Sequence, residues 1–221
     1  MSICKQLSYT KSQCAPRHFP VENSLNYTAH QAIKPLVIAG PSGVGKGTII
    51  KILFERFPGK ISLSVSHTTR NPRLGEKNGT HYHFTQMENM KREISEKKFV
   101  EYAHVHGNYY GTSIESIKSV ISEGKVCVLD IDVQGVIAFK KSDFEPNYTF
   151  IKPPNMKVLE ERLRGRKSET EENIHKRLKN AKKEIEFGSK ENFDLVLVND
   201  DLTVTANNLI SQLLLWYPFL K

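Results

Sequence analysis

The chain has 221 residues and carries 32 Lys and Arg against 24 Asp and Glu, with 38 % hydrophobic and 25 % charged residues. The length predicts one folded domain with an appendage or insertion. The share of hydrophobic residues and the small charge imbalance exclude a largely disordered chain. No apolar run reaches the roughly 18 residues of a transmembrane helix. Three cysteines without a CxxC pair favour a reducing compartment over a disulfide scaffold or a structural zinc site. The net charge of +8 indicates a polyanionic partner and leaves nucleic acid, a membrane surface and nucleotide phosphates open.

Residues 1–33 show no hydrophobic period and are rich in Ser, Asn, His and Gln. Glu22 is the only acidic residue of this segment, which is also a property of organelle transit peptides. We therefore expect an N-terminal extension outside the fold, either disordered or used for targeting. Without targeting, the expected location is the cytoplasm.

From Pro35 onward, short apolar runs alternate with amphipathic segments. Buried strands are predicted at residues 35–40, 125–130, 148–151 and 194–198. Helices are predicted from about residue 49 to the Pro58-Gly59 stop and at about 155–164, 171–187 and 202–216. Strands of nearly continuous Val, Ile and Leu separated by helices are typical of a parallel sheet covered on both faces. The predicted fold class is therefore α/β.

The region 66–112 breaks this rhythm. Residues 81–84 and 99–102 are predicted as short, partly exposed strands on either side of a helix at about 86–97. We expect an inserted α+β lobe here. Four histidines of the region, His81, His83, His104 and His106, alternate as metal ligands can, but no Cys or acidic partner stands at zinc spacing. They are interpreted as exposed strand residues.

A glycine-rich loop lies between the first predicted strand and the first predicted helix. Its residues are Gly40, Pro41, Ser42, Gly43, Val44, Gly45, Lys46, Gly47 and Thr48. Glycines at this spacing let successive backbone N–H groups and the helix N-terminus face a phosphate, and the lysine adds a positive charge that follows the β- and γ-phosphates. The segment predicts a phosphate-binding loop that holds ATP.

Gly47 departs from the usual pattern, in which Ser or Thr follows the lysine and binds Mg²⁺ through its hydroxyl group. The Lys-Gly-Thr ending resembles that of adenylate kinases. Mg²⁺ is then expected to rest on phosphate oxygens and water, with Asp130 holding one water. Alternatively, Asp130 only caps its strand or pairs with Lys46.

The stretch from Ser64 to Arg73 contains two arginines whose planar forks suit a phosphate. Together with the segments 75–82, 107–112 and 129–135, it resembles guanylate kinase from about residue 34 to the C-terminus. The resemblance implies a P-loop NTPase-type domain over 34–216, with a GMP-binding lobe at 66–125 and a lid at 163–173. It also implies Mg²⁺-dependent transfer of the ATP γ-phosphoryl group to GMP, and to dGMP.

The resemblance assigns roles to individual residues. The acceptor phosphate falls to Arg70, Arg73, Tyr82 and Tyr110, and the guanine base to Ser66, Glu101, Thr112 and Asp132. The transferring phosphoryl group falls to Lys46, Arg70, Arg166 and Arg177, and the adenine side to Asn199. Taken alone, Glu101 also suits an edge-strand charge, Asp132 a helix N-cap and Arg177 a basic helix surface.

Two other functions remain open at this point. Guanylate-kinase-like domains also serve as non-catalytic modules that bind phosphopeptides, although those typically lack an intact phosphate loop. A nucleoside monophosphate kinase for another base is suggested by the Lys-Gly-Thr ending, whereas Glu101 and Asp132 favour guanine. The expected partners are ATP and GMP, with no nucleic acid and no membrane, and the expected state is a monomer or weak dimer.

Overall fold

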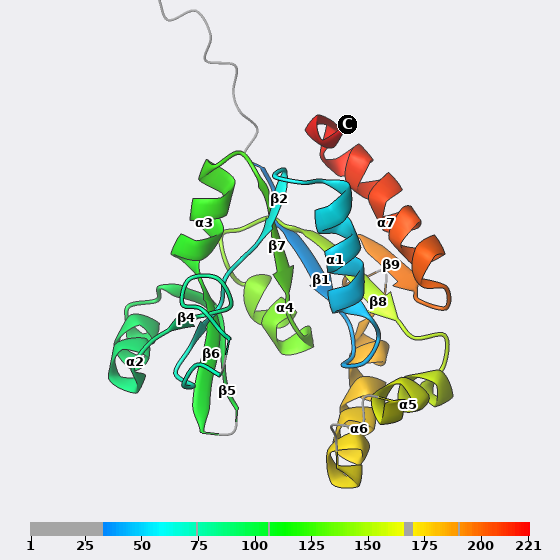
Figure 1. Cartoon of the computed structure of the whole chain (residues 1–221), viewed down its shortest axis with the longest axis horizontal. Coiled ribbons are helices and arrows are strands. Elements are labelled where there is room, and N and C mark those ends of the chain that lie inside the picture. Colours follow the sequence, from blue (N-terminus) through cyan, green and yellow to red (C-terminus); the bar gives the residue numbers. More distant parts are fainter. Residues whose placement is uncertain (1–32, 74, 106, 166–169, 190) are drawn as a thin grey trace, which may run out of the picture. The chain divides into compact units, whose positions relative to one another are not determined.

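The computed structural model describes residues 33–73, 75–105, 107–165, 170–189 and 191–221 (Figure 1). The chain divides into two units, residues 1–31 and 32–221, and the described residues all belong to the second. The predicted extension at 1–33 therefore lies outside the described residues except for Ile33, and it stays a prediction. Across the described part of the chain, no helix has the length and hydropathy needed to cross a membrane.

A five-stranded parallel sheet forms the centre of the fold. Its strands, in the spatial order β2-β7-β1-β8-β9, are Ile61–Leu63, Val126–Asp130, Leu36–Ala39, Asn147–Lys152 and Leu195–Val198. β1 pairs with β7 on one side and with β8 on the other, so that its four residues are completely buried. The parallel sheet confirms the predicted α/β class, and its strands are mostly apolar, as expected for strands covered on both faces.

Helices cover both faces of this sheet. On one face Leu36 and Ile38 pack in a core with α1 (Lys46–Arg56), α5 (Met156–Gly165) and α7 (Leu202–Trp216). Figure 1 shows α1 and α7 next to each other on this face. On the other face Val37 and Ala39 pack with α3 (Ile114–Ser122) and α4 (Val133–Phe139). The two remaining helices of this part are α6 (Glu171–Phe187) and the short η1 (Pro218–Leu220).

The region between β2 and α3 forms a separate small sheet. Its order is β4-β3-β6-β5, with bounds His83–Phe84, His67–Thr68, Asn108–Ser113 and Phe99–Val105, and α2 (Met87–Ser95) lies between β4 and β5 in the chain. β3 pairs with β6 in antiparallel orientation and with β4 in parallel orientation. The predicted strands at 81–84 and 99–102 correspond to β4 and β5. β3 and β6 were not predicted, because β3 has only two residues and β6 has a largely polar sequence.

Candidate active site

The predicted phosphate loop connects β1 to α1, as its sequence indicates. Gly45 has a φ of +104°, and a Cβ atom at this position would lie 2.6 Å from the side-chain nitrogen of Asn199. That side chain in turn donates a hydrogen bond of 2.7 Å from Nδ2 to the carbonyl oxygen of Val44. Glycine is therefore needed at 45 both for the backbone conformation and for the close approach of β9's end.

Lys46 is the first residue of α1 and is largely buried, with a side chain 15 % exposed. Its Nζ donates a hydrogen bond of 2.7 Å to the carbonyl oxygen of Gly40 and lies 3.7 Å from Oδ1 of Asp130 at the end of β7. The pairing of Asp130 with Lys46 is thus present. Loss of hydration raises the pKa of Asp130, and the neighbouring Lys46 opposes this shift.

The Asp130 carboxylate remains 39 % exposed, so water can reach it. A Cβ at Gly47 would meet nothing within 4 Å, and Thr48 is exposed. Among the described residues, no group of three or more His, Cys, Asp or Glu side chains could hold a metal ion by itself. These features fit a Mg²⁺ ion that is bound through phosphate oxygens and water rather than by a protein cage.

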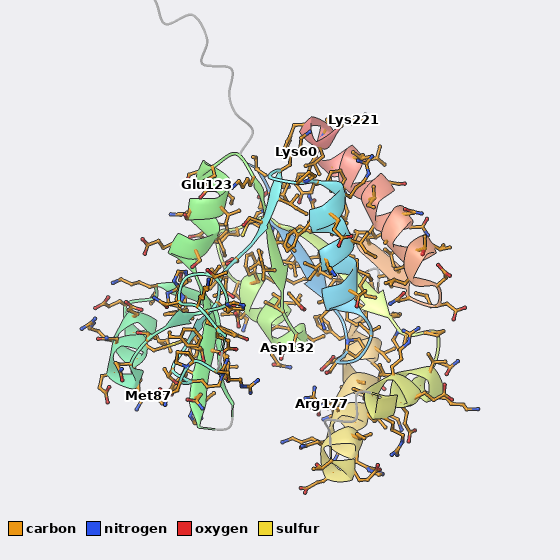
Figure 2. The ribbon with its side chains drawn as sticks, in the orientation of Figure 1. Lys60, Met87, Glu123, Asp132, Arg177 and Lys221 are labelled. Carbon is orange, nitrogen blue, oxygen red and sulfur yellow. The ribbon has the colours of Figure 1, made fainter. Side chains whose placement is uncertain are left out.

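Two more side chains join the loop to distant elements. Arg177 of α6, labelled in Figure 2, donates a hydrogen bond of 2.5 Å from Nη1 to Oγ of Ser42. Asn199 is only 3 % exposed, and its Oδ1 has no hydrogen-bond partner in the described structure. A buried acceptor without a partner is costly, so this oxygen is a candidate contact for a ligand donor.

A cavity of about 300 Å³ lies between the small sheet and α4. Its lining contains five of the predicted acceptor-site residues and Asp130; the six are Ser66, Tyr82, Glu101, Tyr110, Asp132 and Asp130. A larger cavity of about 630 Å³ beside α2 and α3 contains none of the predicted site residues in its lining. The chemistry of the side chains, rather than cavity size, therefore identifies the candidate site. Because Asp130 also lies beside Lys46, the cavity adjoins the phosphate loop.

The two carboxylates predicted to bind the base lie at this cavity in different environments. Glu101 follows a β-bulge on the edge strand β5, and its Oε1 accepts a hydrogen bond of 2.6 Å from the hydroxyl of the buried Thr112. Burial raises the pKa of Glu101, the Thr112 bond lowers it, and the negative charge of Asp132 raises it further. Asp132 caps α4 through Oδ1, which accepts from the N–H of Gly135 at 2.9 Å. The capping bond uses only Oδ1, so Oδ2 of Asp132 can accept a hydrogen bond from a ligand.

The four residues predicted to bind the acceptor phosphate are brought together only in part. The Arg70 guanidinium lies 5.5 Å from the ring centre of Tyr82, whose ring meets that of Tyr110 edge to face at 6.1 Å. Arg73 is exposed, and neither arginine belongs to the described lining of the cavity. Arg70 instead forms a two-bond ion pair with Glu76.

Parts of the predicted site lie outside the described residues. Arg166 belongs to the undescribed segment 166–169, so its predicted contact with the phosphoryl group stays a prediction. The predicted lid at 163–173 is described only at its two ends, where α5 ends at Gly165 and α6 begins at Glu171. Among the histidines, His106 also lies outside the described residues.

The structure adds residues that the sequence did not single out. Arg162 of α5 donates from Nη1 to the carbonyl oxygen of Asn199 at 3.0 Å, which joins α5 to the end of β9. Glu184 of α6 has a pKa raised by burial, an effect that Lys46 opposes and Asp132 reinforces. A recognisable signal existed only for Arg162, which stands four residues before Arg166 in the basic run at the end of α5.

The raised pKa of Glu101 predicts an acid limb in ligand binding. As the pH is lowered, affinity for the GMP that the resemblance implies should begin to fall while the pH is still above 4.5, the ordinary pKa of this group, because a protonated carboxyl loses an acceptor. Without a ligand, the stability of the fold depends on pH in the opposite direction. Ionisation of the Glu101 carboxyl opposes folding, so its contribution to stability is full below pH 4.5 and is lost as the pH rises through its raised pKa. Calorimetric GMP titrations over this range test the limb.

The phosphate of GMP also changes its charge with pH, so the pH profile of GMP binding needs a control that separates this effect from the ionisation of Glu101. The Glu101→Gln variant contains the same phosphate titration but no carboxyl at 101. The difference between the two pH profiles therefore reports on Glu101. Parallel profiles would contradict the prediction.

Residues 32–214 match the family model described as guanylate kinase. The chain is 54 % identical over 177 residues to Guanylate kinase 1 of Oryza sativa, with 80 % of this chain and 46 % of that protein covered. It is 48 % identical over 170 residues to guanylate kinase of Sus scrofa, with 76 % and 86 % covered. The chain thus spans about half the length of the plant relative.

A solved structure agrees with these relatives. The crystal structure of guanylate kinase from Anaplasma phagocytophilum is similar to the described fold, with a TM-score of 0.60 and 34 % sequence identity. The similarity covers 81 % of this chain and 84 % of that one. The matched family model, the identity to relatives and the shared fold all agree with the resemblance carried by the sequence motifs. The chain belongs to the guanylate kinase family.

Proposed function

We propose that this protein transfers the γ-phosphoryl group of ATP to GMP, and to dGMP, giving ADP and the guanosine diphosphate. The observation that carries the proposal is the position of Asp130. Its carboxylate lies 3.7 Å from the phosphate-loop lysine Lys46 and also lines the cavity that contains Glu101 and Asp132. A triphosphate on the loop and a nucleotide in the cavity would therefore have their phosphates next to each other.

The donor side is suited to adenine. The Asn199 amide is fixed by its Nδ2 bond to Val44, which leaves Oδ1 as an unpaired buried acceptor. The exocyclic amine of adenine would supply the missing donor, whereas guanine has a carbonyl oxygen at the same position. Phosphates on the loop would meet backbone N–H groups, the N-terminus of α1 and Lys46.

The acceptor side is suited to guanine. Its N1–H and 2-amino groups are donors, and the carboxylates of Glu101 and Asp132 are acceptors at one cavity. Thr112 already occupies Oε1 of Glu101, which leaves Oε2 for the base. Adenine lacks the 2-amino group and would leave a buried acceptor unpaired, at a cost of about 1–3 kcal/mol.

Charge neutralisation and alignment would then produce catalysis. Lys46 approaches the phosphates from α1, Arg177 reaches the loop from α6, and Arg70 lies beside Tyr82 on the acceptor side. The acceptor oxygen of GMP is already ionised, so no general base is needed. Mg²⁺ would enter with ATP and neutralise the charge of its phosphates, with Asp130 as the residue placed to hold one of its waters.

An acceptor survey tests the reaction and its specificity together. ADP formation with the full chain, ATP and Mg²⁺ is measured separately for GMP, dGMP, AMP and dTMP. We expect turnover with GMP and dGMP and a kcat/KM for AMP that is lower by about tenfold or more. Equal rates with AMP and GMP would contradict the guanine assignment. Absence of ADP formation with any acceptor, combined with phosphopeptide binding, would favour the non-catalytic module.

A further inference from the structure

Glu76 is a half-buried carboxylate at the acceptor side to which the proposed reaction gives no task. Its side chain is 18 % exposed, and its two oxygens accept hydrogen bonds of 2.9 and 3.0 Å from Nη2 and Nη1 of Arg70. The oxygen that accepts from Nη1 is Oε2, and it also accepts a third hydrogen bond, of 2.7 Å, from the backbone N–H of Arg73. One carboxylate thus connects both arginines of the predicted phosphate group.

The bonding pattern leaves a defined part of the Arg70 guanidinium for a ligand. Arginine has five N–H groups in a planar fork. Two of them bond Glu76 and one bonds the carbonyl oxygen of Asn71 at 2.7 Å. The other two, Nε–H and the second Nη2–H, form the side edge of the fork, whose shape suits a phosphate. Arg70 also shares a side-chain hydrogen bond with Tyr110, to which the resemblance assigns the same phosphate. The rings of Tyr82 and Phe84, at 5.5 and 5.8 Å, flank the same group.

The second arginine is fixed through its backbone. The N–H of Glu76 donates a hydrogen bond of 3.0 Å to the carbonyl oxygen of Arg73, which closes a turn. Gly75, the third residue of that turn, has a φ of +87°, a conformation that glycine adopts without strain. The bond from the Arg73 N–H back to the Glu76 carboxylate then locks this turn onto Arg70.

We propose that Glu76 is a positioning residue for the acceptor phosphate, which it serves by holding Arg70 and Arg73 in the one arrangement that presents both to the same anion. This inference rests on the proposed function, because it takes Arg70 and Arg73 as phosphate contacts. Glu76 itself does not touch the phosphate. The pKa of Glu76 is lowered to about 2, chiefly by the Arg70 hydrogen bonds, so the carboxylate is ionised throughout the neutral range.

A simple counter-charge role makes the opposite prediction. If Glu76 only neutralised Arg70, its removal would free a positive charge and strengthen GMP binding. If Glu76 positions Arg70, its removal weakens GMP binding, because the guanidinium can then rotate away from the phosphate. Glutamine separates the two roles: its single oxygen can accept from one arm of the fork, while its NH₂ group faces the other arm as a second donor.

The test is calorimetric titration of the Glu76→Gln variant without ATP, using GMP and guanosine as probes. We expect the Kd for GMP to rise about tenfold and the Kd for guanosine to stay unchanged, because guanosine contains the base but no phosphate. Glu96→Gln is the matched control: Glu96 pairs with Lys98 at 2.7 Å outside the cavity lining. Equal or tighter GMP binding by Glu76→Gln, or an equal loss for guanosine, would overturn the proposal.

A double-mutant cycle with Arg70→Lys gives a second test of the same role. Arg70→Lys keeps the charge but loses the fork, so Glu76→Gln should weaken GMP binding far less in that background than in the wild type. Fully additive losses would overturn the positioning role. Failure of the proposed function is distinguishable, because the unsubstituted chain would then not phosphorylate GMP.

Discussion

Replacing Lys46 by methionine is expected to lower kcat by about 10²–10³-fold or more while the Kd for GMP stays nearly unchanged. Methionine keeps the length of the apolar stem but removes the Nζ that bonds Gly40 and lies beside Asp130. The positive charge that would follow the migrating phosphoryl group is lost, whereas Glu101 and Asp132 at the acceptor cavity are untouched. ADP formation at saturating substrates measures the first quantity, and GMP titration calorimetry measures the second.

Lys51→Met is the matched control for this experiment. Lys51 lies on the same helix, α1, but its side chain is 78 % exposed and pairs only at 3.9 Å with Glu55. An exposed pair of this kind contributes little, so we expect turnover close to that of the unsubstituted chain. Near-normal turnover by Lys46→Met would remove Lys46 from the mechanism.

Replacing Glu101 by glutamine is expected to lower kcat/KM for GMP by about 10²-fold and to change kcat/KM for AMP much less. The Thr112 hydroxyl donates to Oε1 of Glu101 at 2.6 Å, so an amide at this position keeps its oxygen toward Thr112. Its NH₂ group then replaces Oε2 and faces the donors of guanine. Two donors facing each other in a half-buried site cost far more than a lost hydrogen bond between exposed groups.

The measured quantity is the ratio of kcat/KM for GMP to that for AMP. Glu123→Gln serves as a control for the loss of a negative charge, because Glu123 is half-exposed at the end of α3 and pairs with Lys125. We expect this control to leave the ratio unchanged. An unchanged ratio in Glu101→Gln would mean that this carboxylate does not select the base.

The phosphate loop could be predicted from the sequence because its requirements are local. Glycines at fixed spacing, a lysine at the start of a helix and an apolar strand in front all lie within a few residues of one another, and backbone geometry then defines the site. Four of the five strands of the central sheet were predictable for a related reason. A strand buried on both faces is an almost continuous apolar run in the sequence. β2, with only the three residues Ile-Ser-Leu, was not predicted.

The small sheet was predicted less completely. β6, with the sequence Asn-Tyr-Tyr-Gly-Thr-Ser, contains no apolar alternation, and β3 is too short to show one. Both are strands because β3 pairs with β6 across about forty residues, with His67 opposite Gly111. Such pairing depends on the arrangement of distant segments, and no local preference encodes it.

By itself, the sequence determined the α/β class, the glycine-rich loop between the first strand and the first helix, and the types of side chain in the sites proposed for two nucleotides. The tertiary structure decided which of them meet: Arg177 with Ser42 across 135 residues, Asn199 with Val44 across 155, and Asp130 between the loop and the acceptor cavity. It also gave Glu76 its place between the two arginines. The reason is physical: local spacing sets backbone conformation, whereas contacts between side chains far apart in the chain exist only once the core has packed.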